Sequence, residues 1–315
     1  MENRRFFEKA CALFGLQKTE SGGVRICSKG HFAFVLVCIF VLLAGACYIA
    51  HWYLNLARVE RSNEFYRGMY VAAESPSPNA VMPTVPALEP IPTPGADTLV
   101  MPLPTVPPLQ ESFAELLMFN PETVGFLTVP DLVALPVVQR INDNDYYLTH
   151  NFAGEESEEG AIFLDGMNRL ELGDMCLIVY GHNMRNDTMF GRLDEYKSLE
   201  YLQKNCIFHF DTIYQDAAYV PFAVFSASMD ETSASYVNLR QFSFTQERYD
   251  SFVADLKSHS LFDIPVNVAY GDRLLLLVTC NYTQSDGRFV IALRQMHPDE
   301  EEADIREMLI SAEKQ

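Results

Sequence analysis

A cysteine and an arginine stand at the facing ends of two apolar runs near the end of the chain. Cys280 closes the run "LLLLVTC" and Arg288 opens the run "RFVIALRQ". A thiolate is a good nucleophile, and a guanidinium that is always charged can stabilise an oxyanion and lower the pKa of a nearby thiol. If the two runs pair as a hairpin, this pair suits acyl transfer. The alternatives are an inert buried cysteine and a solvated turn arginine, and Arg294 on the same run is a rival for the role of Arg288.

A histidine at the end of another apolar run is the candidate proton carrier. His182 follows "CLIVYG" and opens the loop "HNMRNDTMF", and loops at strand ends often line clefts. An imidazole titrates near neutral pH, so it can give and take protons during acyl transfer; an ordinary loop histidine is the alternative. Cys176 and Cys206 lie at strand starts and are predicted to pack as small apolar groups. The sequence has no CxxC pair and no Cys/His spacing typical of a metal site.

Short β-type runs separated by turn residues must position these side chains. The runs cover 124–129, 135–140, 145–152, 161–166, 175–183, 206–212, 217–229, 273–280 and 288–295. Many short strands with turn punctuation predict one closed antiparallel barrel. Helical spacing predicts a short covering helix at 112–119 and a helix within 245–262 that precedes the last two strands.

A stretch of nineteen residues without an acidic or basic side chain, 32–50, precedes the barrel region. At about 1.5 Å of rise per residue, a helix over it spans roughly 28 Å, close to the hydrocarbon core of a bilayer. Basic residues come before it, and Trp52 and Tyr53 follow it, which predicts a single-pass anchor with a cytoplasmic N-terminus. A cleavable signal with a site at 44–46 is the alternative. The apolar run continues past that site, which favours a retained anchor.

Charge and proline content divide the rest of the chain. The net charge is −19 and residues 1–30 carry +3, so the remainder carries −22, which disfavours binding to nucleic acid. Residues 75–108 hold eleven of the seventeen prolines and are predicted to form an extended stalk of about 100 Å. The predicted organisation is a cytoplasmic segment 1–31, an anchor 32–52, an extracellular Pro-rich stalk 53–111, a folded domain 112–298 and an acidic tail 299–315. We expect a soluble fragment from about residue 110 to retain activity.

Three motifs resemble the signatures of the sortases, the cysteine transpeptidases of Gram-positive bacteria. They are "YGHNM" at 180–184, "VTC" at 278–280, and Arg288. The stretches 120–130, 135–165 and 180–197 resemble class B members, so the resemblance covers roughly residues 112–296. Two positions depart from the family pattern. Leu276 replaces a threonine, and Val278 stands where class B members often have serine, which removes a hydroxyl that could contact substrate.

The resemblance implies an eight-stranded sortase-type barrel and a reaction that needs no cofactor and no metal. Cys280 would attack the carbonyl of a Thr–Gly-type bond in a C-terminal sorting signal and leave a thioester. His182 would protonate the leaving amine and deprotonate the incoming one, and Arg288 would stabilise the oxyanion. The implied substrate-binding residues are Thr279, Asn183 and Tyr180. The implied partners are surface proteins with a sorting signal and an amine of a peptidoglycan precursor or the cell wall, with the chain held in the cell membrane.

Other functions stay open at this point. A Cys–His peptidase would let water replace the amine, and a pilin-polymerising sortase would take a lysine side chain as acceptor. A membrane-tethered adhesin or binding module on a stalk is the non-enzymatic alternative, for which Cys280→Ala would leave function intact. The acidic run at 155–159 is interpreted as a surface loop, with calcium binding as its alternative.

Overall fold

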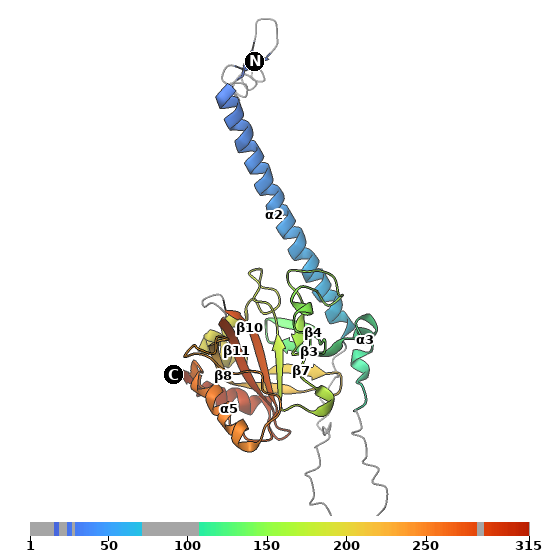
Figure 1. Cartoon of the computed structure of the whole chain (residues 1–315), viewed down its shortest axis with the longest axis vertical. Coiled ribbons are helices and arrows are strands. Elements are labelled where there is room, and N and C mark those ends of the chain that lie inside the picture. Colours follow the sequence, from blue (N-terminus) through green and yellow to red (C-terminus); the bar gives the residue numbers. More distant parts are fainter. Residues whose placement is uncertain (1–15, 19–23, 27–28, 71–106, 282–286, 315) are drawn as a thin grey trace, which may run out of the picture. The chain divides into compact units, whose positions relative to one another are not determined.

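The computed structural model describes residues 16–18, 24–26, 29–70, 107–281 and 287–314, with Cys280 and Asn281 described by their backbone. The chain divides into two compact units, Met1–Ser62 and Asn63–Gln315. Figure 1 shows the second unit as a barrel of strands with helices on its outside. Each unit is described by itself below.

The first unit contains a small hairpin and most of a long helix. Strand β1 (Leu16–Lys18) pairs antiparallel with β2 (Val24–Ile26). Helix α2 (Lys29–Met69) follows, and its most apolar 18-residue window has a mean hydropathy of 2.8 with none of the window buried. By length and composition this helix is able to cross a membrane, which is consistent with the predicted anchor.

Eight strands of the second unit close into a barrel, as predicted. Around the barrel the order is β10-β11-β8-β7-β3-β4-β5-β6. The strands are β3 (Thr123–Val129), β4 (Val133–Val138), β5 (Ile162–Leu164), β6 (Cys176–Tyr180), β7 (Phe208–Thr212), β8 (Ala218–Ser228), β10 (Leu274–Asn281) and β11 (Gly287–Gln295). The barrel is not wholly antiparallel, because β4 pairs parallel with β5 and β10 pairs parallel with β6. Each of these parallel pairs joins strands that are separated by a long connection, as parallel pairing requires.

One predicted strand is absent from this barrel. Residues 145–152 contain a 3-10 turn, η2 (Tyr146–Leu148), instead of a strand. The Asp143 carboxylate accepts hydrogen bonds from the backbone N–H groups of Asp145 and Tyr146 at 3.0 and 3.2 Å. A short acidic side chain that binds nearby backbone in this way offers the chain an alternative to a sheet ladder. The tyrosine-rich pattern therefore predicted a strand where local hydrogen bonds form a turn.

Helices and short strands cover the outside of the barrel. They are η1 (Glu111–Phe113), α3 (Ala114–Phe119), η3 (Leu170–Leu172), η4 (Leu193–Lys197), α4 (Leu199–Lys204), α5 (Gln246–Ser258), β9 (Phe262–Asp263), α6 (Glu302–Ile310) and β12 (Glu313–Lys314). The predicted helices at 112–119 and within 245–262 are confirmed as η1–α3 and α5. The acidic tail forms α6, which buries Ile305 and Leu309, and ends in β12, which pairs with β9.

The end of helix α2 belongs to the second unit and packs on the barrel wall. We call residues 63–70 the docking segment. The ring of Tyr70 stacks on Phe126 of β3 with centroids 4.2 Å apart, and its hydroxyl donates to Asp211 at 2.8 Å. Arg67 Nε donates to the carbonyl of Ala134 at 3.0 Å. Residues 53–69, which we expected to be part of a Pro-rich stalk, are therefore helical, and the rest of the predicted stalk up to 106 lies outside the described residues.

The chain re-enters the described structure close to the place where it leaves it. Gln110 donates from its backbone to the Ile213 carbonyl and from its side chain to the Thr212 carbonyl, each at 2.8 Å. These two acceptors directly follow Asp211, the acceptor of Tyr70. Described residues on both sides of 71–106, Tyr70 and Gln110, therefore form hydrogen bonds at the same end of β7.

Candidate active site

The pairing of β10 with its two neighbours brings three chain segments to one end of the barrel. In the antiparallel register of β10 and β11, Cys280 pairs with Arg288. In the parallel register of β10 and β6, Val278 pairs with Tyr180. The N–H of Gly181 donates to the Val278 carbonyl at 3.3 Å. The loop that opens with His182 therefore begins beside the end of β10.

Backbone groups of the segment before β5 hold the ring of His182. Its Nε2 lies 2.7 Å from the Leu148 carbonyl oxygen. A carbonyl oxygen can only accept, so Nε2 carries a hydrogen and Nδ1 is the basic nitrogen of the neutral ring. Gly160, with φ +60°, lies directly against the ring, because a Cβ there would meet His182 Cδ2 at 3.2 Å and the Leu148 carbonyl at 3.0 Å. A larger residue at 160 would clash first with the Tyr147 carbonyl and would shift the backbone that holds the imidazole.

His182 and Arg288 line one cavity of about 250 Å³. The other lining residues come from the ends of β5, β6 and β10 and from the segments before β5 and after β8: Asn144, Asp145, Leu148, Phe163, Tyr180, Gly181, Met229, Leu239, Arg240, Val278 and Thr279. Of the six predicted site residues, four line this cavity. Cys280 follows Thr279 in β10, and Asn183 follows His182 but is not among the lining residues.

Thr279 presents an unusual polar atom to this cavity. The residue is 2% exposed, and its hydroxyl has no hydrogen-bond partner among the described residues. A buried hydroxyl without a partner costs free energy. Its neighbour Val278 is also buried. It presents an apolar side chain at the position where the class B resemblance implies a serine hydroxyl.

A buried carboxylate lies under the cavity and binds three of its lining side chains. Asp165 directly follows β5, and its side chain is fully buried. It accepts hydrogen bonds from Tyr180 at 3.0 Å, Asn144 at 3.1 Å and, through both oxygens, Arg240 at 2.9 and 3.0 Å. Burial raises the pKa of the Tyr180 hydroxyl, and the negative charge of Asp165 raises it further, so Tyr180 stays a hydrogen-bond donor.

Asp165 and Arg240 were not predicted from the sequence. An acidic residue directly after the apolar run "AIFL" was a usable signal for Asp165, since a charge at a strand end lies near a barrel mouth. Arg240 lies in an irregular segment between β8 and α5, where no periodicity indicates which way a side chain points.

The rival residues lie elsewhere. Arg294 pairs with Leu274 at the other end of the hairpin, about 20 Å from Arg288 at about 3.3 Å per residue. It is 1% exposed and makes two hydrogen bonds of 2.7 Å with Glu300. Cys176 and Cys206 are fully buried, as predicted, and burial raises the pKa of both thiols.

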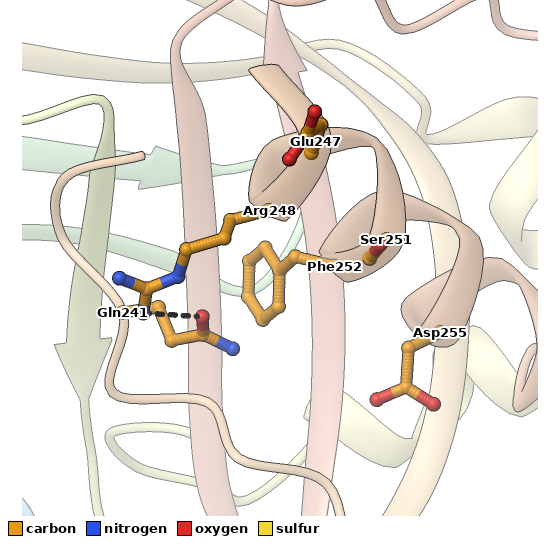
Figure 2. A pocket seen from close by; sticks show the side chains of 6 residues that line it. All are labelled: Gln241, Glu247, Arg248, Ser251, Phe252 and Asp255. Atoms are coloured by element: carbon orange, nitrogen blue, oxygen red, sulfur yellow. Dashed lines mark hydrogen bonds between the residues drawn. The ribbon is translucent and has the colours of Figure 1, made fainter. Parts of the chain in front are cut away.

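A second hollow, of about 450 Å³, lies between α5 and the segment that precedes it. Figure 2 shows its six lining residues, with Arg248 donating to Gln241 at 3.5 Å: Gln241, Glu247, Arg248, Ser251, Phe252 and Asp255. It is more open than the cavity beside His182, and its lining includes neither a histidine nor a cysteine. These residue types make it the weaker candidate for acyl transfer.

Comparisons with known proteins identify the family of the chain. The model of the sortase domain family matches residues 127–295. Sortase B of Listeria monocytogenes is 32% identical over 187 residues, which cover 58% of this chain and 73% of that protein. Sortase B of Staphylococcus aureus is 30% identical over 189 residues, which cover 59% of this chain and 75% of that protein.

A solved structure shows the same similarity in three dimensions. The X-ray structure of Clostridium perfringens sortase B is 32% identical, with a TM-score of 0.53, and the match covers 57% of this chain and 97% of that one. The region matched by the family model, 127–295, includes all but the first residues of the barrel and the strand ends that line the cavity beside His182.

Proposed function

Because the chain belongs to the class B sortases, which are cysteine transpeptidases, we propose that it joins surface proteins to a cell-wall amine through a thioester on Cys280. The observation that carries this proposal is the register of β10, which pairs Cys280 with Arg288 at the cavity lined by Arg288 and His182. Directly paired residues of an antiparallel ladder project to the same face of a sheet.

In the first half of the proposed reaction, the Cys280 thiolate attacks the carbonyl carbon of the scissile bond in a C-terminal sorting signal. A carbon–sulfur bond forms and the carbon–nitrogen bond breaks, and His182 supplies the proton with which the amine leaves. The oxyanion of the tetrahedral intermediate is stabilised by Arg288, whose described hydrogen bond, to the Gly287 carbonyl, occupies only Nη1. The product is a thioester between the surface protein and Cys280.

In the second half, an amine of a peptidoglycan precursor or the cell wall attacks the thioester. His182 takes the proton of this amine, a new amide bond forms, and the thiolate leaves. An imidazole suits both steps, because it can give and take a proton near neutral pH.

We further propose that Thr279 and Tyr180 bind the peptide of the sorting signal. The Thr279 hydroxyl is buried at the cavity without a described partner, so a peptide oxygen or N–H would satisfy it. The ring of Tyr180 lines the cavity while its hydroxyl binds Asp165. Asn183 lies outside the lining, and we propose that it meets the peptide beyond the cavity.

The location proposed for this enzyme is the cell membrane of a Gram-positive bacterium. Helix α2 would cross the membrane once, with the N-terminus inside and the barrel outside. The basic residues before the helix and the aromatic residues after its apolar stretch support this orientation.

Mass spectrometry of the protein incubated with a library of sorting peptides tests the proposal. We expect an adduct on Cys280 whose mass equals the acyl part of one peptide, and its transfer to an amine supplied afterwards. Cys280→Ala should form no adduct, and Cys206→Ala, which changes a buried thiol away from the cavity, should form it normally. A folded parent protein that forms no adduct with any sorting peptide would contradict the proposal, and release of the acyl group only to water would indicate a peptidase.

A further inference from the structure

The carboxylate of Asp165 accepts hydrogen bonds from four segments of the chain. Oδ2 accepts from Tyr180, Asn144 and Arg240 Nε, and Oδ1 accepts from Arg240 Nη2 and the Met167 N–H. Its side chain is fully buried, so five hydrogen bonds replace its lost hydration. A carboxylate with this many partners fixes the geometry of every side chain that it binds.

Arg240 is the partner that brings a charge to the cavity. It lies between β8 and α5, lines the cavity beside Arg288, and its side chain is 44% exposed. The bonds to Asp165 use Nε and Nη2, which form one edge of the guanidinium. Its third nitrogen, Nη1, has no hydrogen-bond partner among the described residues.

The charges around the cavity nearly balance. Arg240 and Arg288 contribute two positive charges, while Asp165 beneath the cavity and Asp145 in its lining contribute two negative ones. A site without net charge has little electrostatic attraction for a charged ligand. Neutral amide oxygens of a peptide are therefore the acceptors that suit the half-exposed guanidinium of Arg240.

We propose that Arg240 is a substrate-binding residue, which Asp165 holds in place so that Nη1 donates hydrogen bonds to amide oxygens of the sorting-signal peptide. This role rests on the proposed function and adds a second guanidinium to the site. Arg288 acts on the oxyanion that forms during the reaction, whereas Arg240 binds oxygens that are present before and after it. Losing Arg240 should therefore weaken peptide binding and leave the chemical step unchanged.

Peptide affinity measured in a Cys280→Ala background tests this role without any chemistry. The probe is the library peptide that forms the Cys280 adduct on the parent protein. We expect Arg240→Met to weaken its binding by about 10- to 100-fold, the usual range for a lost hydrogen bond to a charged group. With Cys280 present, KM should rise by a similar factor at nearly constant kcat.

Arg192→Met is the matched control. Arg192 is 38% exposed and binds Glu195 through Nε and Nη2, as Arg240 binds Asp165, but it does not line the cavity. Peptide affinity should stay within about twofold in this variant, because exposed ion pairs contribute little. Arg240→Lys keeps the positive charge and should give an intermediate affinity, since one ammonium group cannot bind both Asp165 oxygens and the peptide in the same geometry.

The outcomes separate this inference from the proposed function. If the parent forms its adduct and Arg240→Met and Arg240→Lys are folded with unchanged affinity, the role of Arg240 is overturned and the proposed function stands. A lower melting temperature with unchanged affinity also overturns it, because Arg240 would then be only structural. If no sorting peptide reacts with the parent, the proposed function fails and the role of Arg240 fails with it.

Discussion

Arg288 and Arg294 are two arginines on one strand with opposite environments. Arg288 pairs with Cys280 at one end of the β10–β11 hairpin, is half-buried, and lines the cavity beside His182. Arg294 pairs with Leu274 at the other end, is fully buried, and binds Glu300 through two hydrogen bonds of 2.7 Å. Among the described residues the first has no carboxylate partner, and the second binds a carboxylate of its own chain.

The difference shows what burial and pairing do to the same side chain. A buried guanidinium needs a partner with good geometry, because an unpaired buried charge costs several kcal/mol. Glu300 is that partner for Arg294 and ties the segment before α6 to the end of β11. Arg288 keeps hydrogen-bonding capacity at a cavity, which suits transition-state stabilisation. Substitutions at the two positions should therefore affect different properties.

Substitution of Arg288 should have the largest effect, and on activity. We expect Arg288→Met to slow formation of the Cys280 adduct by about 100- to 1,000-fold, the usual cost of losing one oxyanion-stabilising group. The melting temperature should change little, because the residue is half-buried and has no described carboxylate partner. Single-turnover mass spectrometry and thermal melts measure the two properties. A normal rate in a folded Arg288→Met protein would exclude the proposed role and remove the contrast with Arg294.

Substitution of Arg294 should act on stability instead. We expect Arg294→Met to lower the free energy of unfolding by about 3–5 kcal/mol, because it leaves the Glu300 carboxylate without its main partner. The rate of adduct formation per folded molecule should stay close to that of the parent, since this end of the hairpin lies about 20 Å from Arg288. Urea unfolding measures the change. A double variant with Glu300→Gln should recover part of the loss, and no recovery would argue against the ion pair as the cause.

The docking segment offers a third test, again with stability changed and activity kept. A fragment that begins at residue 107 lacks Tyr66 and Tyr70, whereas one that begins at 63 keeps them. Both rings pack on the folded domain, with Tyr66 7% exposed and in contact with Phe152, and Tyr70 stacked on Phe126 of β3. We expect the shorter fragment to remain active, as the sequence predicts, and to be less stable by about 2–4 kcal/mol, from about 1.5–3 kcal/mol for each large buried side chain less the cost of ordering the segment.

Tyr70→Phe in the longer fragment is the matched control for this comparison. It keeps the stacked ring and removes only the hydrogen bond to Asp211, so it should cost about 1 kcal/mol. Equal stability of the two fragments would mean that the docking segment contributes nothing to the folded domain, and loss of activity in the shorter one would contradict its separation from the site.

Those parts of the fold that follow from local pattern were predictable from the sequence. Alternating and apolar runs identified the eight barrel strands, and the strand ends at 182, 280 and 288 could be named because polar residues interrupt apolar runs there. The run at 145–152 was misread as a strand because hydrogen bonds of Asp143, which a hydrophobic pattern does not encode, fold it into a turn. The parallel pairings of β4 with β5 and β10 with β6 depend on long connections, which periodicity does not describe.

The side-chain pairs of the site could not be predicted from the sequence for the same reason. Asp165 and Arg240 are 75 residues apart, and no local spacing brings them together. The position of Arg288 at a strand end favoured it over Arg294 in the sequence, but the ion pair of Arg294 with Glu300, which lies in the segment after the strand, was not predictable. The helical docking segment was likewise not predicted, because its aromatic side chains lie at the end of a helix whose apolar part dominates the pattern.

The smallest expected effect is the pH dependence of the pair at the buried end of the hairpin. Burial acts to raise the pKa of the Glu300 carboxyl, but hydrogen bonds from Arg294 and the His297 N–H, together with their charges, outweigh it and lower the pKa. A pKa below that of the unfolded chain means that Glu300 stabilises the fold above the unfolded value, about 4.3 for glutamate, and that this stabilisation is lost as the pH falls through the folded value. The difference in unfolding free energy between the parent and Glu300→Gln should therefore be constant near pH 7 and shrink below about pH 4.

Glu122→Gln is the control for this measurement. Arg140 also lowers the pKa of Glu122 against the effect of burial. Because both side chains are about one-third exposed, solvent screens this pair, and the change in unfolding free energy with pH should be smaller. A difference at Glu300 that does not vary with pH would show that the pair acts through packing, and Arg294 would then differ from Arg288 by burial alone.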